Sequence, residues 1–267
     1  MPEEKAAGYD FAALKGIVAR LRSPDGCPWD RQQTHTSLQP FLIEECYEVL
    51  QAIEEGDPQK LCEELGDLLL QIMLHAQIAS EAGQFNIEDV VAGIAGKLVH
   101  RHPHVFGNEK AKEARQVELN WEVLKQEEKG AEESLLSGVP ETMPALAYSQ
   151  SVQRRAAAVG FDWESVDEIL DKLTEEVAEI RRAPNQQEKA KEFGDLLFTL
   201  ANIARRLDID LETALRSANR RFCQRFKYME QACRERGVEI SSLSLEEQNA
   251  LWEEAKAKVK DGRGERT

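Results

Sequence analysis

The stretch Glu44-Glu45-Cys46-Tyr47-Glu48, followed by Glu63-Glu64-Leu65-Gly66-Asp67-Leu68-Leu69, decides the fold of the first half of this chain. The second half repeats it as Glu175-Glu176-Val177-Ala178-Glu179, followed by Glu192-Phe193-Gly194-Asp195-Leu196-Leu197. Each copy reads E-E-x-x-E and then E-x-x-D within an apolar run. Residues three or four apart lie on the same face of an α-helix. Each copy therefore predicts two neighbouring helices that direct four carboxylates towards one point.

The repeat extends beyond the acidic residues. Glu45 and Glu176 are separated by 131 positions, and so are Trp121 and Trp252. Pro28-Trp29-Asp30 before the first acidic helix is echoed by Phe161-Asp162-Trp163 before the second. The same order of elements in both halves predicts tandem domains. We expect them at residues 1–128 and 145–260, joined by a linker at 129–144 and followed by a tail at 261–267.

Apolar residues recur at helical spacing through most of the chain, and no stretch alternates as a β-strand would. Gly56-Asp57-Pro58 predicts the end of one helix and the capped start of the next, and Pro103 predicts another helix end. The expected fold is therefore all-α, with two tandem helical-bundle domains. The expected helices span 38–55, 58–82, 87–101 and 111–129 in the first half, and 145–158, 165–182, 187–207, 211–236 and 244–260 in the second.

Charge and composition narrow the functional class. The net charge of the 267 residues is −15, which argues against general nucleic-acid binding, because that needs a basic surface. No apolar run is long enough for a membrane span, and the N-terminus does not resemble a signal peptide. The five cysteines form no C-x-x-C pair, which favours a reduced, cytoplasmic protein. We expect no nucleic-acid or membrane partner.

The acidic clusters need compensating charge. Four carboxylates on the flank of an apolar stripe would repel one another unless they are protonated or bind a metal ion. All the donors are oxygens, which favours Mg²⁺, with Mn²⁺ as a possible substitute, over Zn²⁺. A di-iron bundle would place histidine three residues after glutamate, where this chain has Asp67 and Asp195. A solvated acidic face is the ordinary explanation of one such motif, and two copies in the same order favour the metal site over it.

Four motifs follow one another along the chain: Gly26-Cys27-Pro28-Trp29-Asp30-Arg31-Gln32-Gln33-Thr34-His35, Glu44-Glu45-x-x-Glu48, Glu64-x-x-Asp67 and Arg101-His102-Pro103-His104-Val105-Phe106. This ordered set resembles the MazG-type nucleoside triphosphate pyrophosphohydrolases. This resemblance implies an all-α nucleoside triphosphate pyrophosphatase fold with tandem MazG-like domains and a homodimer. It also implies Mg²⁺-dependent hydrolysis of nucleoside triphosphates, including non-canonical ones, to monophosphate and pyrophosphate, which would control nucleotide pools.

The resemblance also implies which residues act. In the second half the expected metal ligands are Glu176, Glu179, Glu192 and Asp195. Together with Glu175 they form the expected catalytic set. The expected metal ligands in the first half are Glu45, Glu48, Glu64 and Asp67. The expected nucleotide-binding residues are Lys172, Glu175, Lys189, Lys191, Asn219, Arg221, Arg225 and Trp252. A possible site in the first half would add Glu44, Lys97, Arg101 and Trp121. Cationic side chains would neutralise phosphate charge, and Trp252 would stack on the base. Trp29 and Trp163 are expected only to pack.

The two halves differ in ways that bear on activity. The second connection, residues 181–187, lacks the Gly-Asp-Pro of the first, so its loop geometry is open. Basic residues are more numerous near the second acidic motif, which predicts that the second domain is the principal hydrolase. The first domain would then be active, regulatory or mainly dimerising. Two alternatives stay open: a narrower, dUTPase-like dNTP hydrolase, and a non-enzymatic helical protein that binds metal or a basic partner.

Overall fold

A computed structural model describes residues 8–107, 117 and 134–259 of the chain. Every regular element within these residues is helical, and none is a strand, so the predicted all-α class is confirmed. The chain divides into two compact units, residues 1–112 and 113–267, and each is described separately. Apart from residue 117, the predicted helix at 111–129, with Trp121, and the predicted boundary at residue 128 lie outside the described residues. Among the described helices, none is both long and apolar enough to cross a membrane.

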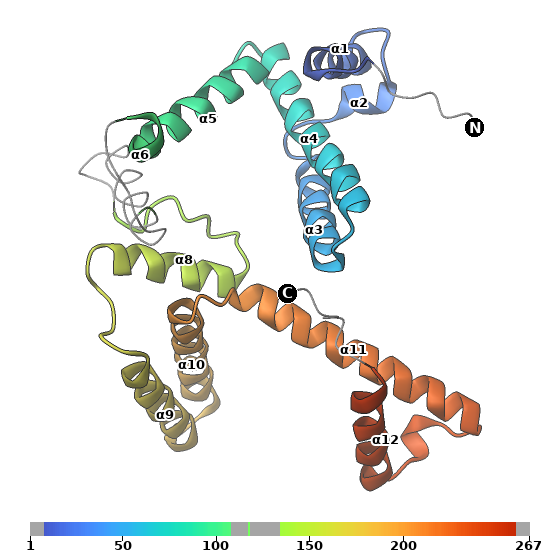
Figure 1. The fold of residues 1–267 in the computed structure, drawn as a ribbon, viewed down its shortest axis with the longest axis vertical. Helices are drawn as coiled ribbons and strands as arrows, with labels where there is room; N and C mark the ends of the chain where they lie inside the picture. The colour runs from blue at the N-terminus through green and yellow to red at the C-terminus, as the bar shows by residue number, and fades with distance from the viewer. Residues whose placement is uncertain (1–7, 108–116, 118–133, 260–267) are drawn as a thin grey trace. The chain divides into compact units, whose positions relative to one another are not determined.

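The first unit is built around one helical hairpin. α3 and α4 pack along each other, and α1 and α5 pack against α4 (Figure 1). A small hydrophobic core holds these helices together. It includes Val18 of α1, Met73 of α4, and Leu38, which directly precedes α3. The helices are α1 (Phe11–Arg22), α2 (Pro28–Gln32), α3 (Gln39–Glu55), α4 (Pro58–Glu81), α5 (Ile87–Arg101) and α6 (Pro103–Phe106). Helices α1 and α2 precede residues 38–55, which form the first helix predicted from the sequence.

The turn between α3 and α4 forms as its sequence predicts. Gly56 ends α3 with φ 68°, in the left-handed region that glycine adopts without steric cost. The Asp57 carboxylate accepts hydrogen bonds from the backbone N–H groups of Gln59 and Lys60, and Pro58 begins α4. This tight turn makes the two helices antiparallel neighbours, which sets the two acidic motifs side by side.

The second unit contains an equivalent hairpin. α9 and α10 pack along each other, α8 packs against α10, and α11 extends from this group to a second contact with α12 (Figure 1). α11 and α12 share a separate small core that includes Met229, Cys233 and Leu251. The helices are α8 (Ala145–Ala158), α9 (Val166–Arg182), α10 (Gln186–Arg206), α11 (Leu211–Arg236), the 3₁₀ helix η1 (Ile240–Ser242) and α12 (Leu245–Lys258).

The connection between α9 and α10 reaches the same result with different residues. Ala183 ends α9, and the Asn185 side chain caps α10 by accepting a hydrogen bond from the backbone N–H of Glu188. The shorter loop without Gly-Asp-Pro therefore also brings α10 back alongside α9. This is the loop geometry that the sequence left open.

The described part of the predicted linker, residues 134–144, is attached to the second unit. The buried guanidinium of Arg155 on α8 donates hydrogen bonds to the backbone carbonyls of Leu136, Ser137 and Gly138. These bonds hold the segment against α8, so these residues belong structurally to the second unit.

Candidate active site

Three carboxylates converge between α9 and α10. Glu176 and Glu179 lie one turn apart on α9, and Glu192 faces them from α10. Their carboxylate oxygens all lie within 4.8 Å of one another. We call Glu176, Glu179 and Glu192 the second carboxylate cluster. Glu176 is 3% exposed, and its Oε2 has no hydrogen-bond partner among the described residues. A buried carboxylate oxygen without a partner is costly, so the site calls for a cation.

Part of that positive charge comes from the chain itself. The Lys172 Nζ lies 2.9 Å from Oε1 of Glu176 and 3.1 Å from Oε2 of Glu175. The hydrogen bond to Glu176, then that to Glu175, raises the pKa of Lys172, so this side chain stays protonated. Lys172 compensates one oxygen of Glu176 and leaves the other unpaired.

The remaining members of the cluster are less well compensated. Burial raises the pKa of Glu179, and the charges of Glu176 and Glu192 raise it further, while Lys172 opposes the shift. Lys191 Nζ lies 3.4 Å from Oε1 of Glu192, but its own side chain is largely exposed. A divalent cation at the focus of the three carboxylates would relieve this repulsion. Oxygen-only donors, one of them buried and unpaired, fit Mg²⁺ or Mn²⁺.

The first unit holds the matching group. The carboxylate oxygens of Glu45, Glu48 and Glu64 all lie within 4.8 Å of one another, and we call them the first carboxylate cluster. Burial raises the pKa of Glu45, and the charges of Asp67 and Glu48 raise it further. Burial and the charge of Glu48 also raise the pKa of Glu64. Both hairpins therefore concentrate acids as the sequence predicts.

The fourth acid of each motif lies outside the converging three. Asp67 and Asp195 are exposed, three residues beyond Glu64 and Glu192 on the same helices. Asp195 lines a pocket that adjoins the second cluster, and its charge acts on Lys191. Their role as metal ligands stays a prediction.

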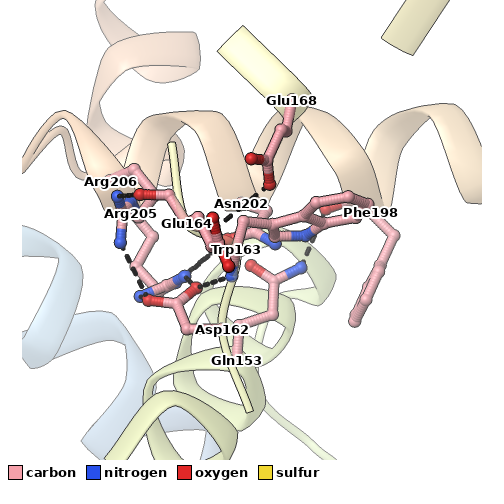
Figure 2. Close-up of polar contacts among 9 residues, drawn as sticks. All are labelled: Gln153, Asp162, Trp163, Glu164, Glu168, Phe198, Asn202, Arg205 and Arg206. Atoms are coloured by element: carbon pink, nitrogen blue, oxygen red, sulfur yellow. Dashed lines mark hydrogen bonds and ion pairs between the residues drawn. The ribbon is translucent and has the colours of Figure 1, made fainter. Parts of the chain in front are cut away.

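A pocket of about 1050 Å³ opens beside the second cluster. Pockets for small molecules usually have volumes of this order. Glu176, Lys172 and Asp195 line it together with residues of α8, of the connection before α9, and of the later turns of α10, some of which Figure 2 shows. The other residues that line it are Leu136, Val152, Gln153, Ala156, Gly160, Phe161, Asp162, Trp163, Glu164, Glu168, Ile169, Phe198, Thr199, Asn202 and Arg205.

The wall before α9 is fastened by ion pairs. Asp162 accepts hydrogen bonds from the guanidinium groups of Arg205 and Arg206, and Arg206 also donates to the backbone carbonyl of Glu164 (Figure 2). Burial raises the pKa of Asp162, but the hydrogen bonds and charge of Arg205 outweigh burial and hold this pKa below its ordinary value. These contacts fix the backbone on both sides of Trp163.

The other expected nucleotide-binding residues lie elsewhere in the second unit. Lys189 and Lys191 are exposed on α10, and Asn219, Arg221 and Arg225 lie on α11. Trp252 of α12 lies 5.3 Å from Phe222 between ring centroids, and the Arg225 guanidinium carbon lies 6.0 Å from the Trp252 ring. None of these residues lines the pocket. Their contact with nucleotide stays a prediction.

The described candidates in the first half lie on two helices, α3 and α5. Glu44 is exposed on α3 next to Glu45, whose pKa its charge helps to raise. Lys97 is exposed on α5, and Arg101 is half-buried at the end of that helix. Trp121 lies outside the described residues, so a site formed by these four residues stays a prediction.

Part of the pocket is formed by residues for which the sequence predicted no functional role. Gln153, Phe198, Asn202 and Arg205 received no role, and Trp163 was expected only to pack, although 38% of it is exposed in this pocket. One signal was available for α10, because Asn202 follows Asp195 by seven residues and so lies on the same helical face. No local pattern marks Gln153, since α8 reaches the pocket only through tertiary packing.

Both halves match models of pyrophosphohydrolase families. Residues 33–106 match the MazG nucleotide pyrophosphohydrolase domain. Residues 149–222 match phosphoribosyl-ATP pyrophosphohydrolase. The two matched ranges contain the first and second carboxylate clusters respectively.

Similar proteins cover nearly the whole chain. A protein of Thermotoga maritima named nucleoside triphosphate pyrophosphohydrolase/pyrophosphatase MazG is 46% identical over 94% of this chain and 98% of its own length. The Escherichia coli K12 nucleoside triphosphate pyrophosphohydrolase is 42% identical over 91% of this chain and 95% of its own. The uncharacterized protein YabN of Bacillus subtilis is 48% identical over 95% of this chain, but over only 53% of its own length. With paired acidic hairpins in both halves and full-length similarity at this level, the chain belongs to the MazG family of nucleoside triphosphate pyrophosphohydrolases.

Proposed function

We propose that the second unit hydrolyses nucleoside triphosphates to nucleoside monophosphate and pyrophosphate with the help of Mg²⁺, and thereby controls nucleotide pools. The observation that carries this proposal is the second carboxylate cluster, which holds a buried unpaired oxygen of Glu176 at the edge of a large pocket. The names of the similar proteins support the reaction. The acidic oxygens support the metal.

Glu176, Glu179 and Glu192 would hold the ion, with Asp195 at the pocket side. Bound Mg²⁺ would supply positive charge for the phosphate oxygens and lower the pKa of a water molecule. Lys172 lies at the border of cluster and pocket and would neutralise charge on the polyphosphate. An acidic protein can in this way bind a polyanion at one site.

At the α-phosphorus, one bond forms and one bond breaks. The oxygen of water bonds to the α-phosphorus, the bond from that phosphorus to the bridging oxygen breaks, and pyrophosphate leaves. The proton of the water must pass to a base. We assign this role to Glu175, whose exposed carboxylate adjoins Glu176 but is not one of the three converging groups.

A product assay tests this proposal. With Mg²⁺ and a panel of common and deaminated NTPs and dNTPs, the wild-type protein should release pyrophosphate and no orthophosphate, and EDTA should stop the release. Release of orthophosphate, or the absence of product from every nucleotide, would overturn the proposal. Activity on dUTP alone would favour the narrower hydrolase.

Self-association is part of the same proposal. The acidic hairpins carry large apolar side chains that are at least one-third exposed, among them Ile43, Leu65 and Ile72 in the first unit and Phe193 and Leu197 in the second. Exposed apolar faces of this kind favour burial against a second copy of the chain. Sedimentation equilibrium should give twice the chain mass of 30.2 kDa. A monomer at micromolar concentration would contradict the homodimer.

A further inference from the structure

A pair of histidines in the first unit lies outside both carboxylate clusters and the pocket. His35 belongs to the connection at 33–38, between α2 and α3, and His75 lies in the second half of α4. Their Nδ1 atoms are 2.7 Å apart, although 40 positions separate the two residues in the chain. Neither side chain takes part in the reaction proposed above, so this contact needs another explanation.

The two rings meet edge to edge. Their planes are inclined by only 6°, and their centroids are 5.1 Å apart. Face-to-face stacking would keep the atoms of the two rings about 3.5 Å or more apart, which the distance between the Nδ1 atoms rules out. The centroid separation instead exceeds the Nδ1–Nδ1 distance by about the width of a ring, as expected when both Nδ1 atoms point at each other. This is the geometry of an N–H···N hydrogen bond.

The hydrogen bond holds one proton between the two nitrogens, since one Nδ1 must donate and the other must accept. It therefore forms when both rings are neutral or when one of them is a cation. It cannot form when both rings are cations, because each Nδ1 then carries a proton and can only donate. Two protonated rings at this distance would also repel each other.

His75 is the member of the pair that resists the second proton. Its Nε2 is buried and has no hydrogen-bond partner among the described residues, whereas His35 is exposed. Burial lowers the pKa of His75, and the charge of His35 lowers it further. We therefore expect the first proton on His35, and a second proton can bind to His75 only when the contact opens.

The charged groups on the surrounding elements do not compensate a second proton. Of the described charges, only that of His35 shifts the pKa of His75. The charged side chains of α1, α2, α3 and α5 near this part of α4 have other hydrogen-bond partners: Arg22 binds Glu81 and the carbonyl of Asp30, Lys15 binds Glu88, Arg31 binds the carbonyl of Pro24, Glu45 binds Gln71, and Asp89 binds the backbone N–H of Asn86. Acid therefore acts on this contact through the two histidines.

The contact holds the entry to α3. Within the connection, the side-chain oxygens of Thr34 and Ser37 each accept a hydrogen bond from the other residue's backbone N–H, so the residues around His35 form a compact turn. Leu38 ends the connection and is 1% exposed in the core, and its backbone N–H donates to the carbonyl of Thr34 at 3.1 Å. Release of His35 would loosen this turn and with it the start of α3, which carries two members of the first carboxylate cluster.

We propose that His35 and His75 form a pH-sensitive latch, which fastens the connection at 33–38 to α4 at neutral pH and releases it as the pH falls. This inference does not depend on the reaction proposed for the second unit. Because the closed latch excludes one proton, its stabilising effect is present above the ordinary histidine pKa of 6.5 and is lost as the pH falls from there through the lowered pKa of His75. The closing equilibrium should fall about tenfold between pH 7.5 and pH 5.5.

Hydrogen exchange followed by mass spectrometry tests the latch in the full-length protein, with EDTA present to exclude metal binding. After correction for the intrinsic exchange rate, the protection of peptides that cover residues 33–42 should fall about tenfold between pH 7.5 and pH 5.5. All five histidines lie in the first unit, so the connection at 159–165 before α9 is the internal control and should show no such fall. Equal protection of residues 33–42 at the two pH values would overturn the proposal.

Variants assign the effect to the pair. His75→Phe keeps a ring at the partly buried position, and His35→Asn changes only an exposed side chain. Each variant should remove the pH dependence of the protection, because no second proton can then compete with the contact. His100→Gln, at an exposed histidine of α5, is the matched control and should retain the fall. Thermal melting shows whether each variant is folded, and a pH response that persists in folded His35→Asn or His75→Phe would contradict the latch.

Discussion

The two carboxylate clusters have the same acids but different compensation. In the second cluster, Lys172 pairs with Glu176 from one turn away on α9. The corresponding position in the first cluster, four residues before Glu45, is Phe41, whose ring lies 5.9 Å from that of Trp29. Among the described residues, no lysine or arginine forms an ion pair with the first cluster, and its nearest candidate, Lys60, pairs with Glu55. The comparison teaches that the same acidic motif can be combined with a lysine that pairs directly with one of its carboxylates, or can lack such a pair.

The largest expected effect separates the two clusters by activity. Changing Glu176 and Glu179 to Gln should lower kcat for pyrophosphate release by at least about 100-fold, because the metal is lost from the reaction centre. Changing Glu45 and Glu48 to Gln should leave more than half of the activity. Asp171→Asn, an exposed acid on α9 outside the cluster, is the matched control. If activity instead disappears with Glu45 and Glu48, the assignment of the hydrolase to the second unit is reversed.

The lysine that distinguishes the clusters gives the next effect. Lys172→Met should lower kcat/KM for a nucleoside triphosphate by about 10- to 100-fold, because a cation at the border of cluster and pocket is removed. Lys172→Arg keeps the charge and should recover part of this loss. Steady-state kinetics with ATP at saturating Mg²⁺ would measure both variants. An unchanged kcat/KM in Lys172→Met would show that this lysine serves only to stabilise Glu176.

The acidic hairpins could be predicted from the sequence because their determinants are local. Helical spacing, a capping residue and a proline at the start of the next helix are enough to fold α4 back onto α3. The converging positions of Glu45, Glu48 and Glu64 follow from that turn. The same reasoning holds for the hairpin of α9 and α10, although Asn185 replaces the Asp-Pro cap.

The pocket could not be predicted because its determinants are separated in sequence. Gln153 on α8 reaches the carbonyl of Phe198 across 45 positions, and Asp162 pairs with Arg205 across 43. Nothing in helical periodicity states which face of α8 packs on α10. The role expected for Trp252 depends likewise on how α12 is placed, and the structure shows it packed on α11 with Phe222.

A metal-dependent change in stability would sharpen the contrast between the clusters. Raised pKa values for Glu45 and Glu64 mean that the folded state favours their protonated forms. Their contribution to stability is therefore fully present below the ordinary value of 4.5 and is lost as the pH rises through the raised values. At pH 7.5 the metal-free protein carries this repulsion, which bound Mg²⁺ would relieve.

We expect Mg²⁺ to raise the melting temperature by about 2–4 °C at pH 7.5 and by less at pH 5.5, where protons compete for the same oxygens. Differential scanning calorimetry of the apo and Mg²⁺-bound forms would measure this difference. The double change of Glu45 and Glu64 to Gln should stabilise the metal-free protein at pH 7.5 and reduce the Mg²⁺ response. A Mg²⁺ response that is equal in this variant would show that the first cluster binds no metal.

The smallest effect concerns the ion pairs that hold the pocket wall of the second unit. Asp162→Asn should lower the free energy of unfolding by about 1–2 kcal/mol, because a partly buried carboxylate loses its charged partners on α10. The pKa of Asp162 is held below its ordinary value of 3.8, so its contribution is present above that pH and is lost as the pH falls through the lowered value. Urea unfolding should therefore show a constant difference between wild type and variant from pH 8 to pH 5 and a smaller one at more acidic pH.

Asp30 provides the comparison in the first unit, because its position before α3 resembles that of Asp162 before α9. Arg22 donates a hydrogen bond to the backbone carbonyl of Asp30 rather than to its carboxylate. Asp30→Asn should accordingly change stability by less than about 0.5 kcal/mol, and equal losses in the two variants would show that side-chain charge is not what holds the wall of the second unit.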